Sequence, residues 1–316
     1  MALKVLAHFT PGRRVLDFVA AESDWLDVRW CAEDDDTTLR RELPGADVIW
    51  HVLRPLSAAD LELAAKCRLV HKLGAGVNTI DVDAATRCGI AVANMPGANA
   101  PSVTEGTLLL MLAALRRLPV LDRATREGRG WPSDPGLGET VRDIGGCTVG
   151  LVGYGNIATQ VEAVLKTLGA RVLHTSTRDD GHPDWRPLPA LLTESDIVSL
   201  HLPLTSATRH LIDEDALALM KPDAVLVNTA RGPIVDEEAL AAALREGRLA
   251  AAGLDVFATE PVEPGNPLLG LDNVVLTPHV TWYTVDTMRR YLEVAVDNCR
   301  RLRDGRELAN VVNQVS

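Results

Sequence analysis

Short, continuous apolar runs alternate with Ala- and Leu-rich stretches along almost the whole chain, and this alternation restricts the fold more than any other feature of the sequence. A strand that is apolar on both sides is typical of a parallel sheet with helices on both faces, because a solvent-facing side would carry polar residues at every second position. The pattern therefore predicts an α/β protein built from doubly wound parallel sheets. The predicted strands are 4–9, 47–52, 68–73, 90–94, 148–152, 171–175, 197–202, 224–229, 252–256 and 274–276.

Length and charge narrow the class of protein further. The chain has 316 residues, enough for two domains of roughly 100–200 residues each. Its net charge of −11 makes a nucleic acid or an anionic membrane surface a poor partner. The longest apolar stretch, 107–115, is shorter than the ~20 residues of a membrane span, and the N-terminal segment resembles a strand and not a signal peptide. We therefore expect a cytoplasmic protein that binds neither nucleic acid nor membrane.

The cysteines indicate the same compartment. They are odd in number, scattered, and form no CxxC pair; they are Cys31, Cys67, Cys88, Cys147 and Cys299. This usage is typical of reduced, mostly buried thiols and argues against both a disulfide framework and a zinc site. No metal site is predicted.

The segment 149–158 carries a glycine-rich turn, G-x-G-x-x-A, between a predicted strand and a predicted helix over 157–168. Gly153 would permit the tight turn, Gly155 would let the backbone approach a pyrophosphate, and Ala158 would keep the helix close to the strand. A glycine-rich turn alone often has no ligand-binding role. Here the strand, the helix, its C-capping Gly169 and the next strand have the lengths of a dinucleotide-binding unit, which predicts a pyrophosphate at the helix N-terminus.

The end of the next predicted strand bears on the choice between NAD and NADP. In NAD-binding units an acid at this position accepts a hydrogen bond from the ribose 2′-hydroxyl. Ser176 stands there, followed by Thr177 and Arg178, and hydroxyls beside a guanidinium suit a 2′-phosphate. The alternative is that Asp179 or Asp180 turns back to hold an NAD ribose while Arg178 is only solvated. The sequence favours NADP, with NAD as the alternative.

Three other predicted strands are followed by polar residues that have no obvious structural purpose: Arg231, Glu260 and His279. The carboxyl ends of parallel strands meet at one edge of a sheet, where ligands bind. A guanidinium can bind a carboxylate, an imidazole can exchange a proton, and a carboxylate can hold the imidazolium. Each residue alone is ambiguous, since a lone arginine there usually forms a surface salt bridge and a histidine after proline is usually a loop residue. Together they predict carbonyl/alcohol redox chemistry.

With these residues the sequence resembles the D-isomer-specific 2-hydroxyacid dehydrogenase family, which includes D-3-phosphoglycerate dehydrogenase, glyoxylate/hydroxypyruvate reductase and formate dehydrogenase. The resemblance covers essentially the whole chain, and its motifs are specific and stand in family order. The matching stretches are GAGVNTIDVDAA (74–85), GLVGYGNIA (150–158), SDIVSLHLPLT (195–205), LVNTARGPIVDEEAL (226–240), AAGLDVFATEP (251–261) and LTPHV (276–280).

The resemblance implies roles for the catalytic residues. Arg231 would bind the substrate carboxylate and 2-oxygen, His279 would be the general acid/base, and Glu260 would be its partner. Backbone amides of Ala75, Gly76 and Val77 would bind the substrate carboxylate together with Arg231 and His279.

The resemblance also implies a cofactor site. Asp255 would hold the nicotinamide carboxamide, Thr229 and Ala230 would lie along the nicotinamide ribose, and the segment 201–203 would wall the adenine side. The residues expected to contact the cofactor are Ala75, Thr104, Gly153, Tyr154, Gly155, Asn156, Ile157, Ser176, Thr177, Arg178, His201, Leu202, Pro203, Thr229, Ala230, Arg231, Asp255, His279 and Trp282.

Some segments depart from the family pattern. Asn78-Thr79 stand where the family usually has Asp-Asn, which would slightly alter the turn of the substrate loop. Trp282 and Tyr283 follow His279 where many members have small residues. These aromatics would either line the pocket for an apolar 2-oxo acid or pack against the last helix, predicted over 285–304.

Two local expectations concern the middle of the chain. Ser102 and Glu105 have the spacing of a capping box, which predicts a helix that begins after Ser102. The segment 126–138 is rich in Gly and Pro, which predicts no regular element. The resemblance implies a homodimer in which the loop around Trp131 is part of the dimer arm.

The expected architecture is a flavodoxin-like substrate domain over 1–97, to which the C-terminal segment 285–316 returns, with a Rossmann dinucleotide-binding domain over 98–284 inserted into it. The expected function is NAD(P)-dependent hydride transfer between the nicotinamide cofactor and C2 of a small D-2-hydroxy acid or 2-oxo acid. One alternative is D-3-phosphoglycerate dehydrogenase, for which the substrate domain offers mainly Arg54 and Lys72 as phosphate ligands. Another is a non-catalytic nucleotide-sensing corepressor of the same fold, for which the sequence carries no basic patch or low-complexity tail.

Overall fold

The computed structural model describes residues 2–129 and 135–315, which fall into two compact units. The first unit comprises Met1–Asn99 and Tyr283–Ser316, and the second comprises Ala100–Trp282. The second unit is thus an insertion in the first. No helix among the described residues is long and apolar enough to cross a membrane.

The first unit is built on a five-stranded parallel sheet with the order β2-β1-β3-β4-β5. This is the flavodoxin-like order, in which the chain moves first to one side of β1 and then to the other. The strands are β1 (Leu3–His8), β2 (Leu26–Cys31), β3 (Val48–His51), β4 (Leu69–Lys72) and β5 (Ala91–Ala93).

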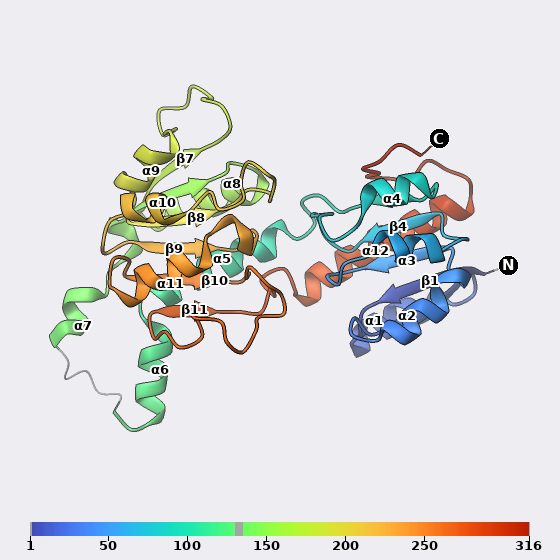
Figure 1. Ribbon diagram of the computed structural model, residues 1–316, viewed down its shortest axis with the longest axis horizontal. Helices are drawn as coiled ribbons and strands as arrows, with labels where there is room; N and C mark the ends of the chain where they lie inside the picture. Colours follow the sequence, from blue (N-terminus) through green and yellow to red (C-terminus); the bar gives the residue numbers. More distant parts are fainter. Residues whose placement is uncertain (1, 130–134, 316) are drawn as a thin grey trace. The chain divides into compact units, whose positions relative to one another are not determined.

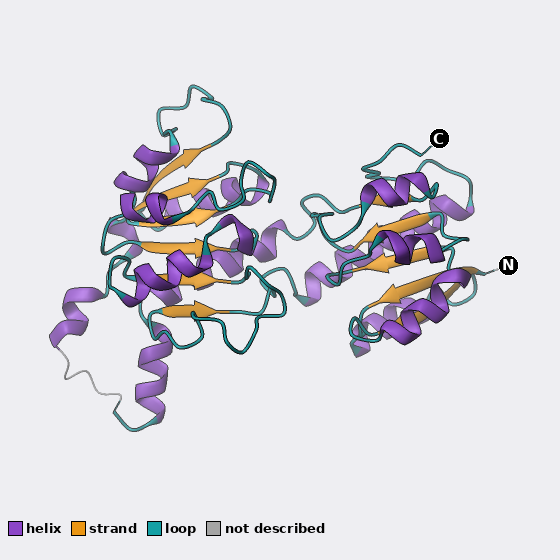
Figure 2. Ribbon diagram, in the orientation of Figure 1, coloured by secondary structure: helices purple, strands orange, loops and turns teal. Residues whose placement is uncertain are grey.

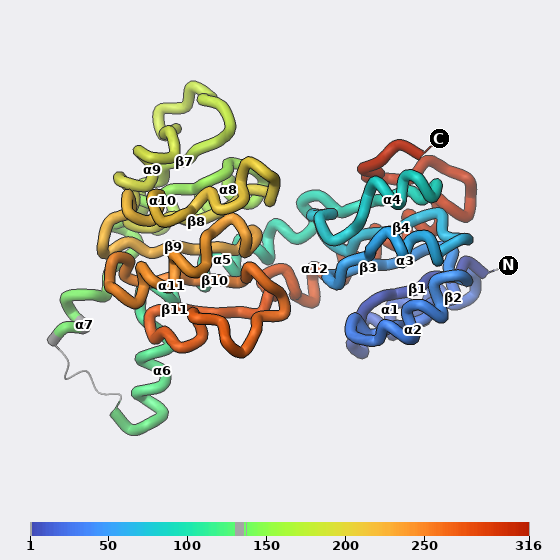
Figure 3. Tube along the Cα trace, viewed as in Figure 1, coloured from blue at the N-terminus to red at the C-terminus, as the bar shows by residue number. Residues whose placement is uncertain are grey.

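Helices cover both faces of this sheet (Figure 2). On one face, Leu6, Ile49 and Val70 pack with Leu39 and Leu61 in a buried core. The C-terminal helix α12, red in Figure 3, belongs to the same unit as the blue N-terminal elements. The helices are α1 (Arg13–Ala20), α2 (Asp36–Glu42), α3 (Ala58–Leu63), α4 (Val82–Arg87) and α12 (Val285–Arg303), with a 3₁₀ turn, η1, at Leu43–Gly45.

The second unit contains a six-stranded parallel sheet with the order β11-β10-β9-β8-β6-β7 (Figure 1). The chain passes from β6 to β7 on one side and continues with β8 on the other, so the strand order reverses between β6 and β8. Ligands bind doubly wound sheets outside the carboxyl ends of the strands at such a switch point. The strands are β6 (Thr148–Val152), β7 (Arg171–Thr175), β8 (Ile197–Leu200), β9 (Val225–Asn228), β10 (Ala251–Leu254) and β11 (Val274–Leu276).

The apolar strands of the second unit are buried on both faces. Val225 and Val227 lie in one core, with α5 and α8, while Leu226 between them lies in the other, with α9, α10 and α11. This alternation explains the continuous apolar runs and confirms the predicted α/β fold class. The helices are α5 (Ala100–Leu115), α6 (Leu118–Arg126), α7 (Pro135–Thr140), α8 (Asn156–Thr167), α9 (Leu188–Glu194), α10 (Glu214–Leu219) and α11 (Glu237–Arg245), with 3₁₀ turns η2 (Ile144–Gly146) and η3 (Gly232–Ile234).

Three local predictions were wrong. Strand β2 was not expected. Helix α5 begins at Ala100, so Ser102 is buried inside it and is not its N-cap; Pro101 suits the first turn because that turn needs no amide donor. For the same reason α7 begins at Pro135 inside a segment for which no regular element was expected. The loop around Trp131 lies outside the described residues.

Candidate active site

The glycine-rich turn lies at the carboxyl end of β6, at the switch point of the second sheet. Gly153 has a φ of +89°, and a Cβ there would lie 2.5 Å from the carbonyl oxygen of His201. Only glycine fits both the left-handed backbone and the close approach. Gly155 is the N-cap of α8, and Ala158 is fully buried where the helix meets the sheet. The predicted turn, its helix and the segment after β8 are therefore in direct contact.

The residues around this turn fit a dinucleotide. Helix α8 has no side-chain cap, so the N–H groups of its first turn are left for a ligand. A Cβ on Gly155 would meet no atom within 4 Å, which leaves room for a pyrophosphate beside the backbone. The hydroxyl of Thr104, on α5, is buried and has no hydrogen-bond partner in the described chain. Thr107, one turn further, hydrogen-bonds the hydroxyl of Thr229 at 2.8 Å and so joins α5 to the end of β9.

The segment after β8 borders the turn on its other side. His201 donates its backbone N–H to the carbonyl of Val152 at 2.7 Å, and its Nε2 lies 2.9 Å from the hydroxyl of Ser199. Burial lowers the pKa of His201 to about 4, so its ring is neutral at pH 7. Leu202 lies against Gly153, whereas Pro203 is exposed. This segment can form an uncharged wall beside the turn.

His279 and Glu260 form a pair at the carboxyl edge of the same sheet. The Nδ1 atom of His279 lies 2.7 Å from Oε2 of Glu260, and their side chains are 16% and 34% exposed. Burial of Glu260 opposes its ionisation, but the hydrogen bond and charge of His279, the amide of Phe257 at 3.1 Å and the charge of Arg231 outweigh it and lower the pKa of Glu260. Glu260 is thus a carboxylate at neutral pH. The Nε2 of His279 points away from this partner, since the two ring nitrogens lie on different sides of the imidazole.

The loop that carries His279 is held by Asp255, which is fully buried. One carboxylate oxygen of Asp255 accepts from the Thr277 hydroxyl at 2.6 Å and the Val280 amide at 2.9 Å. The other accepts from the amide and hydroxyl of Thr281, at 3.0 and 2.6 Å. These four bonds occupy the acceptor sites of a carboxylate. They fix the loop around His279, whose backbone has a φ of +56°.

Arg231 reaches the same edge from the end of β9. Its guanidinium donates to the carbonyl of Ala230 at 2.6 Å. The next residue, Gly232, is so close to the chain after β10 that a Cβ would lie 1.9 Å from the carbonyl of Phe257. This close approach places Arg231 where its charge acts on Glu260. The three predicted catalytic residues therefore converge within the second unit.

The predicted substrate loop belongs to the first unit and is described there alone. It follows β4, and the carbonyl of Ala75 accepts from Asn94 Nδ2 at 2.7 Å. The backbone N–H groups of Ala75, Gly76 and Val77 donate to no acceptor among residues 2–129 and 135–315. Their predicted role in binding a carboxylate stays a prediction.

The segment after β7 carries the residues predicted to select the cofactor. Ser176 is half-buried and donates its hydroxyl to the carbonyl of Arg178 at 2.6 Å, whereas the side chains of Thr177 and Arg178 are exposed. Arg178 has no ion pair in the described parts of the chain. Asp179 accepts from the Gly181 amide at 2.8 Å, so its carboxylate is turned onto its own loop.

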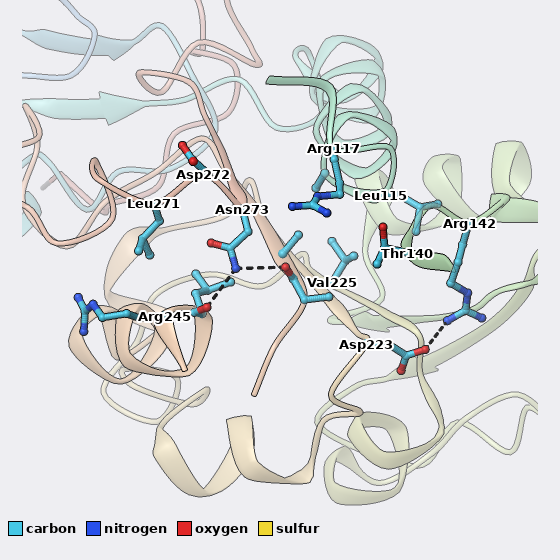
Figure 4. A pocket seen from close by; sticks show the side chains of 14 residues that line it. Leu115, Arg117, Thr140, Arg142, Asp223, Val225, Arg245, Leu271, Asp272 and Asn273 are labelled. Atoms are coloured by element: carbon cyan, nitrogen blue, oxygen red, sulfur yellow. Dashed lines mark hydrogen bonds and ion pairs between the residues drawn. The ribbon is translucent and has the colours of Figure 1, made fainter. Parts of the chain in front are cut away.

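A separate pocket of about 460 Å³ lies at the opposite edge of the second sheet (Figure 4). Its lining includes residues at the beginnings of β9, β10 and β11. Arg142 and Asp223 form an ion pair at 2.9 Å there, and Asn273 donates to the carbonyls of Leu244 and Ala250. None of the predicted catalytic or cofactor residues lines this pocket.

The structure adds residues that the sequence did not single out. Thr277 and Thr281 complete the bonding of Asp255, and their hydroxyls on both sides of His279 are a signal that could have been read. His174 lies under the glycine turn at the end of β7 and contacts Asp180. The sequence did contain one signal for this contact, namely a histidine inside a predicted buried strand.

Comparison with known proteins gives consistent matches. The family model "D-isomer specific 2-hydroxyacid dehydrogenase, NAD binding domain" matches residues 108–281. A glyoxylate reductase of Korarchaeum cryptofilum is 42% identical, with 82% of this chain and 80% of that protein covered. A D-3-phosphoglycerate dehydrogenase of Mycobacterium leprae is 38% identical, with 93% of this chain but only 56% of that protein covered.

Solved structures agree over nearly the whole chain. A protein of Thermus thermophilus superposes with a TM-score of 0.90 at 35% identity and covers 98% of this chain and 100% of its own. An NADPH-dependent glyoxylate/hydroxypyruvate reductase of Sinorhizobium meliloti, in complex with NADP and malonate, has a TM-score of 0.85 at 28% identity and covers 99% and 97%.

Proposed function

The chain belongs to the D-isomer-specific 2-hydroxyacid dehydrogenase family and is an NAD(P)-dependent oxidoreductase, and from that premise we propose that it reduces a small 2-oxo acid with NADPH. The observation that carries the proposal is the His279–Glu260 pair, which lies with Arg231 at the same sheet edge as the glycine turn. An acid/base and a cation thus stand beside a dinucleotide site.

His279 exchanges the proton in this reaction. Its Nδ1 donates to the Glu260 carboxylate, which orients the ring and stabilises the imidazolium. In the direction of reduction, Nε2–H gives its proton to the 2-oxygen of the substrate, and in oxidation the neutral Nε2 takes the proton of the hydroxyl. When bound, the nicotinamide cofactor supplies the hydride that is added to C2.

Arg231 binds the anionic substrate and stabilises charge on its 2-oxygen. Its guanidinium donates to the Ala230 carbonyl, and the fork of N–H donors on a guanidinium matches the two oxygens of a carboxylate. Asp255 keeps the His279 loop in place during turnover. The amides of Ala75, Gly76 and Val77 are proposed to bind the substrate carboxylate from the first unit.

A small substrate without a phosphate fits the first unit better than 3-phosphoglycerate does. The ammonium of Lys72 is buried and donates to the Val52 carbonyl and the Thr79 hydroxyl. Arg54 pairs with Asp36. Both candidate phosphate ligands are therefore engaged within the protein. The glyoxylate reductases among the relatives point to the same class of small 2-oxo acid.

NADP preference is proposed from the end of β7. A carboxylate is missing at the ribose position, where Ser176 and Thr177 are followed by the exposed Arg178, and hydroxyls together with a guanidinium can bind a 2′-phosphate. The S. meliloti reductase, which is NADPH-dependent, supports this assignment.

We further propose a homodimer in the cytoplasm. Helix α6 is amphipathic, yet none of its residues is buried. Leu118, at the start of α6, is 51% exposed, and Leu109, on the preceding helix α5, is 60% exposed. Figure 1 shows α6 extending away from its sheet. Exposed apolar strips of this kind are usually covered by another protein surface. Light scattering after size exclusion would give the mass of the assembly.

The test of the proposed function is steady-state oxidation of NADPH and of NADH with glyoxylate, hydroxypyruvate, pyruvate, phenylpyruvate and 2-oxoisocaproate. We expect turnover with the small 2-oxo acids and a preference for NADPH. Better use of NADH would refute the cofactor assignment. Tight cofactor binding without turnover of any acid would refute the reductase assignment and favour a nucleotide sensor.

A further inference from the structure

His174, which the proposed mechanism does not use, connects the glycine turn to the loop that follows β7. Its side chain is fully buried. The ring stacks on Tyr154 of the glycine turn, with centroids 3.8 Å apart and an angle of 15° between the planes. Tyr154 is itself fixed, because its hydroxyl donates to Glu162 on α8. The position of the His174 ring is therefore set by the cofactor turn.

The polar edge of this ring holds a carboxylate. Nε2 of His174 lies 2.9 Å from Oδ2 of Asp180, and the other oxygen of Asp180 accepts from the His182 amide at 2.9 Å. These bonds from the His182 backbone and the His174 side chain lower the pKa of Asp180, so the group is a carboxylate at neutral pH. One oxygen of Asp180 is thus bound to β7 and the other to the backbone of its own loop.

Asp180 lies only four residues after Ser176, the position at which an acid selects NAD. A carboxylate that reached this position would accept a hydrogen bond from a ribose 2′-hydroxyl and would repel a 2′-phosphate. The loop carries further charges: Asp179 and Asp184 are acidic, while Arg178 is basic. Asp179 is turned onto the Gly181 amide. The selectivity of the site thus depends on where the acids of this loop are held.

We propose that His174 sets the cofactor preference by holding the Asp180 carboxylate away from the ribose position, which leaves Ser176, Thr177 and Arg178 to bind the 2′-phosphate of NADP. The inference rests on the proposed NADP preference and deepens it. His174 is a positioning residue, since it acts through Asp180 and does not itself touch the phosphate.

The test uses binding, so that it does not depend on turnover. Calorimetry would give Kd for adenosine 2′,5′-bisphosphate and for 5′-AMP, and the ratio of the two values is the selectivity for the 2′-phosphate. His174→Phe keeps an aromatic ring under Tyr154 but removes the bond to Asp180. We expect its selectivity to fall at least about tenfold because the released carboxylate opposes the phosphate.

Two further variants separate this role from a structural one. His174→Phe/Asp180→Asn should regain the selectivity of the unmodified protein, because the charge that His174 holds is gone. His182→Gln removes the neighbouring imidazole, 5.4 Å from that of His174, but keeps the backbone amide that binds Asp180, and it should leave the selectivity unchanged.

The outcomes distinguish the two proposals. If the unmodified protein binds 5′-AMP as tightly as the bisphosphate, the NADP assignment itself fails. If it prefers the bisphosphate but His174→Phe weakens both ligands equally, or neither, the positioning role of His174 is refuted. That role is also refuted if the double variant stays as unselective as His174→Phe.

Discussion

The two units contain parallel sheets with the same reversal of strand order, yet their carboxyl edges differ. In the first sheet the neighbouring strands β1, β3 and β4 end in His8, His51 and Lys72, which lie side by side in register. All are buried, and the Lys72 ammonium donates to Val52 and Thr79. In the second sheet β6 ends at Val152 and is followed by Gly153 and the uncapped helix α8.

In both sheets the strand order creates a switch point at the carboxyl edge. The side chains at that edge determine whether a phosphate can bind there. The first switch point is filled by buried side chains: His51 bonds the Arg54 carbonyl and Lys72 donates to Val52 and Thr79, whereas the His8 ring has no hydrogen-bond partner among the described residues. The second has a glycine, a bare helix N-terminus and a neutral His201 as its wall. The second edge therefore offers the uncapped amides of α8, beside an open glycine turn, to an anionic dinucleotide.

The largest expected effect comes from a methyl group at the glycine turn. Gly153→Ala forces an L-residue to a φ of +89° and places Cβ 2.5 Å from the His201 carbonyl. We expect Kd for NADPH to rise at least about 100-fold. Gly12, the N-cap of α1 in the first unit, has open space around it and a φ of −80°, so Gly12→Ala should leave Kd unchanged. Fluorescence titration with thermal unfolding as a folding control checks both, and equal Kd values would contradict the contrast.

A smaller effect is expected at Asp255. In Asp255→Asn one oxygen becomes an amide donor that faces donors from the His279 loop, so the loop loses its fixed geometry. We expect kcat to fall about 10- to 100-fold while Kd for the cofactor changes little. Asp272→Asn, at an exposed acid at the opposite edge of the sheet, is the matched control. A raised cofactor Kd with normal kcat would instead show that Asp255 holds the carboxamide.

The smallest expected effect is on the stability of the fold at acidic pH, and it differs between the two units. Burial lowers the pKa of His8 and His51, and lowers that of His71 to about 4, in the first unit. Such residues stay neutral in the folded chain but are protonated on unfolding near pH 6.5, so stability is lost as pH falls from there toward the folded pKa.

Between pH 7 and 5 we therefore expect the first unit to lose more of its free energy of unfolding than the second, with His71 alone contributing about 2 kcal/mol. Hydrogen exchange of the amides in β1, β3 and β4 against those in β6, β8 and β9 would measure this. His71→Gln should flatten the dependence in the first unit. An equal loss in both units would contradict the assignment.

The sequence predicted most of the fold because most strands are continuous apolar runs. The exception is β2, an edge strand in which Asp27 and Arg29 interrupt the pattern, since one side of it is solvated. The start of α5 was also misplaced, because Ser102 and Glu105 have capping spacing but the helix already begins at Ala100.

The catalytic residues could be found from the sequence because each follows a strand whose carboxyl end lies at the same edge. The bonding of Asp255 could not, since it depends on amides of Val280 and Thr281 whose direction is set by the fold of a loop. The contacts of His174 could not be predicted for a related reason. A histidine in a buried strand reveals neither its stacking partner nor the acid that its ring contacts.

The central claim is that His279 transfers the proton at a site assembled on the second sheet. The most direct measurement is kcat for His279→Ala with saturating NADPH and 2-oxo acid, together with Kd for NADPH. If His279 is the general acid, kcat falls at least about 100-fold, the usual contribution of such a group, while Kd stays within about threefold of the unmodified value. An unchanged kcat would contradict the claim.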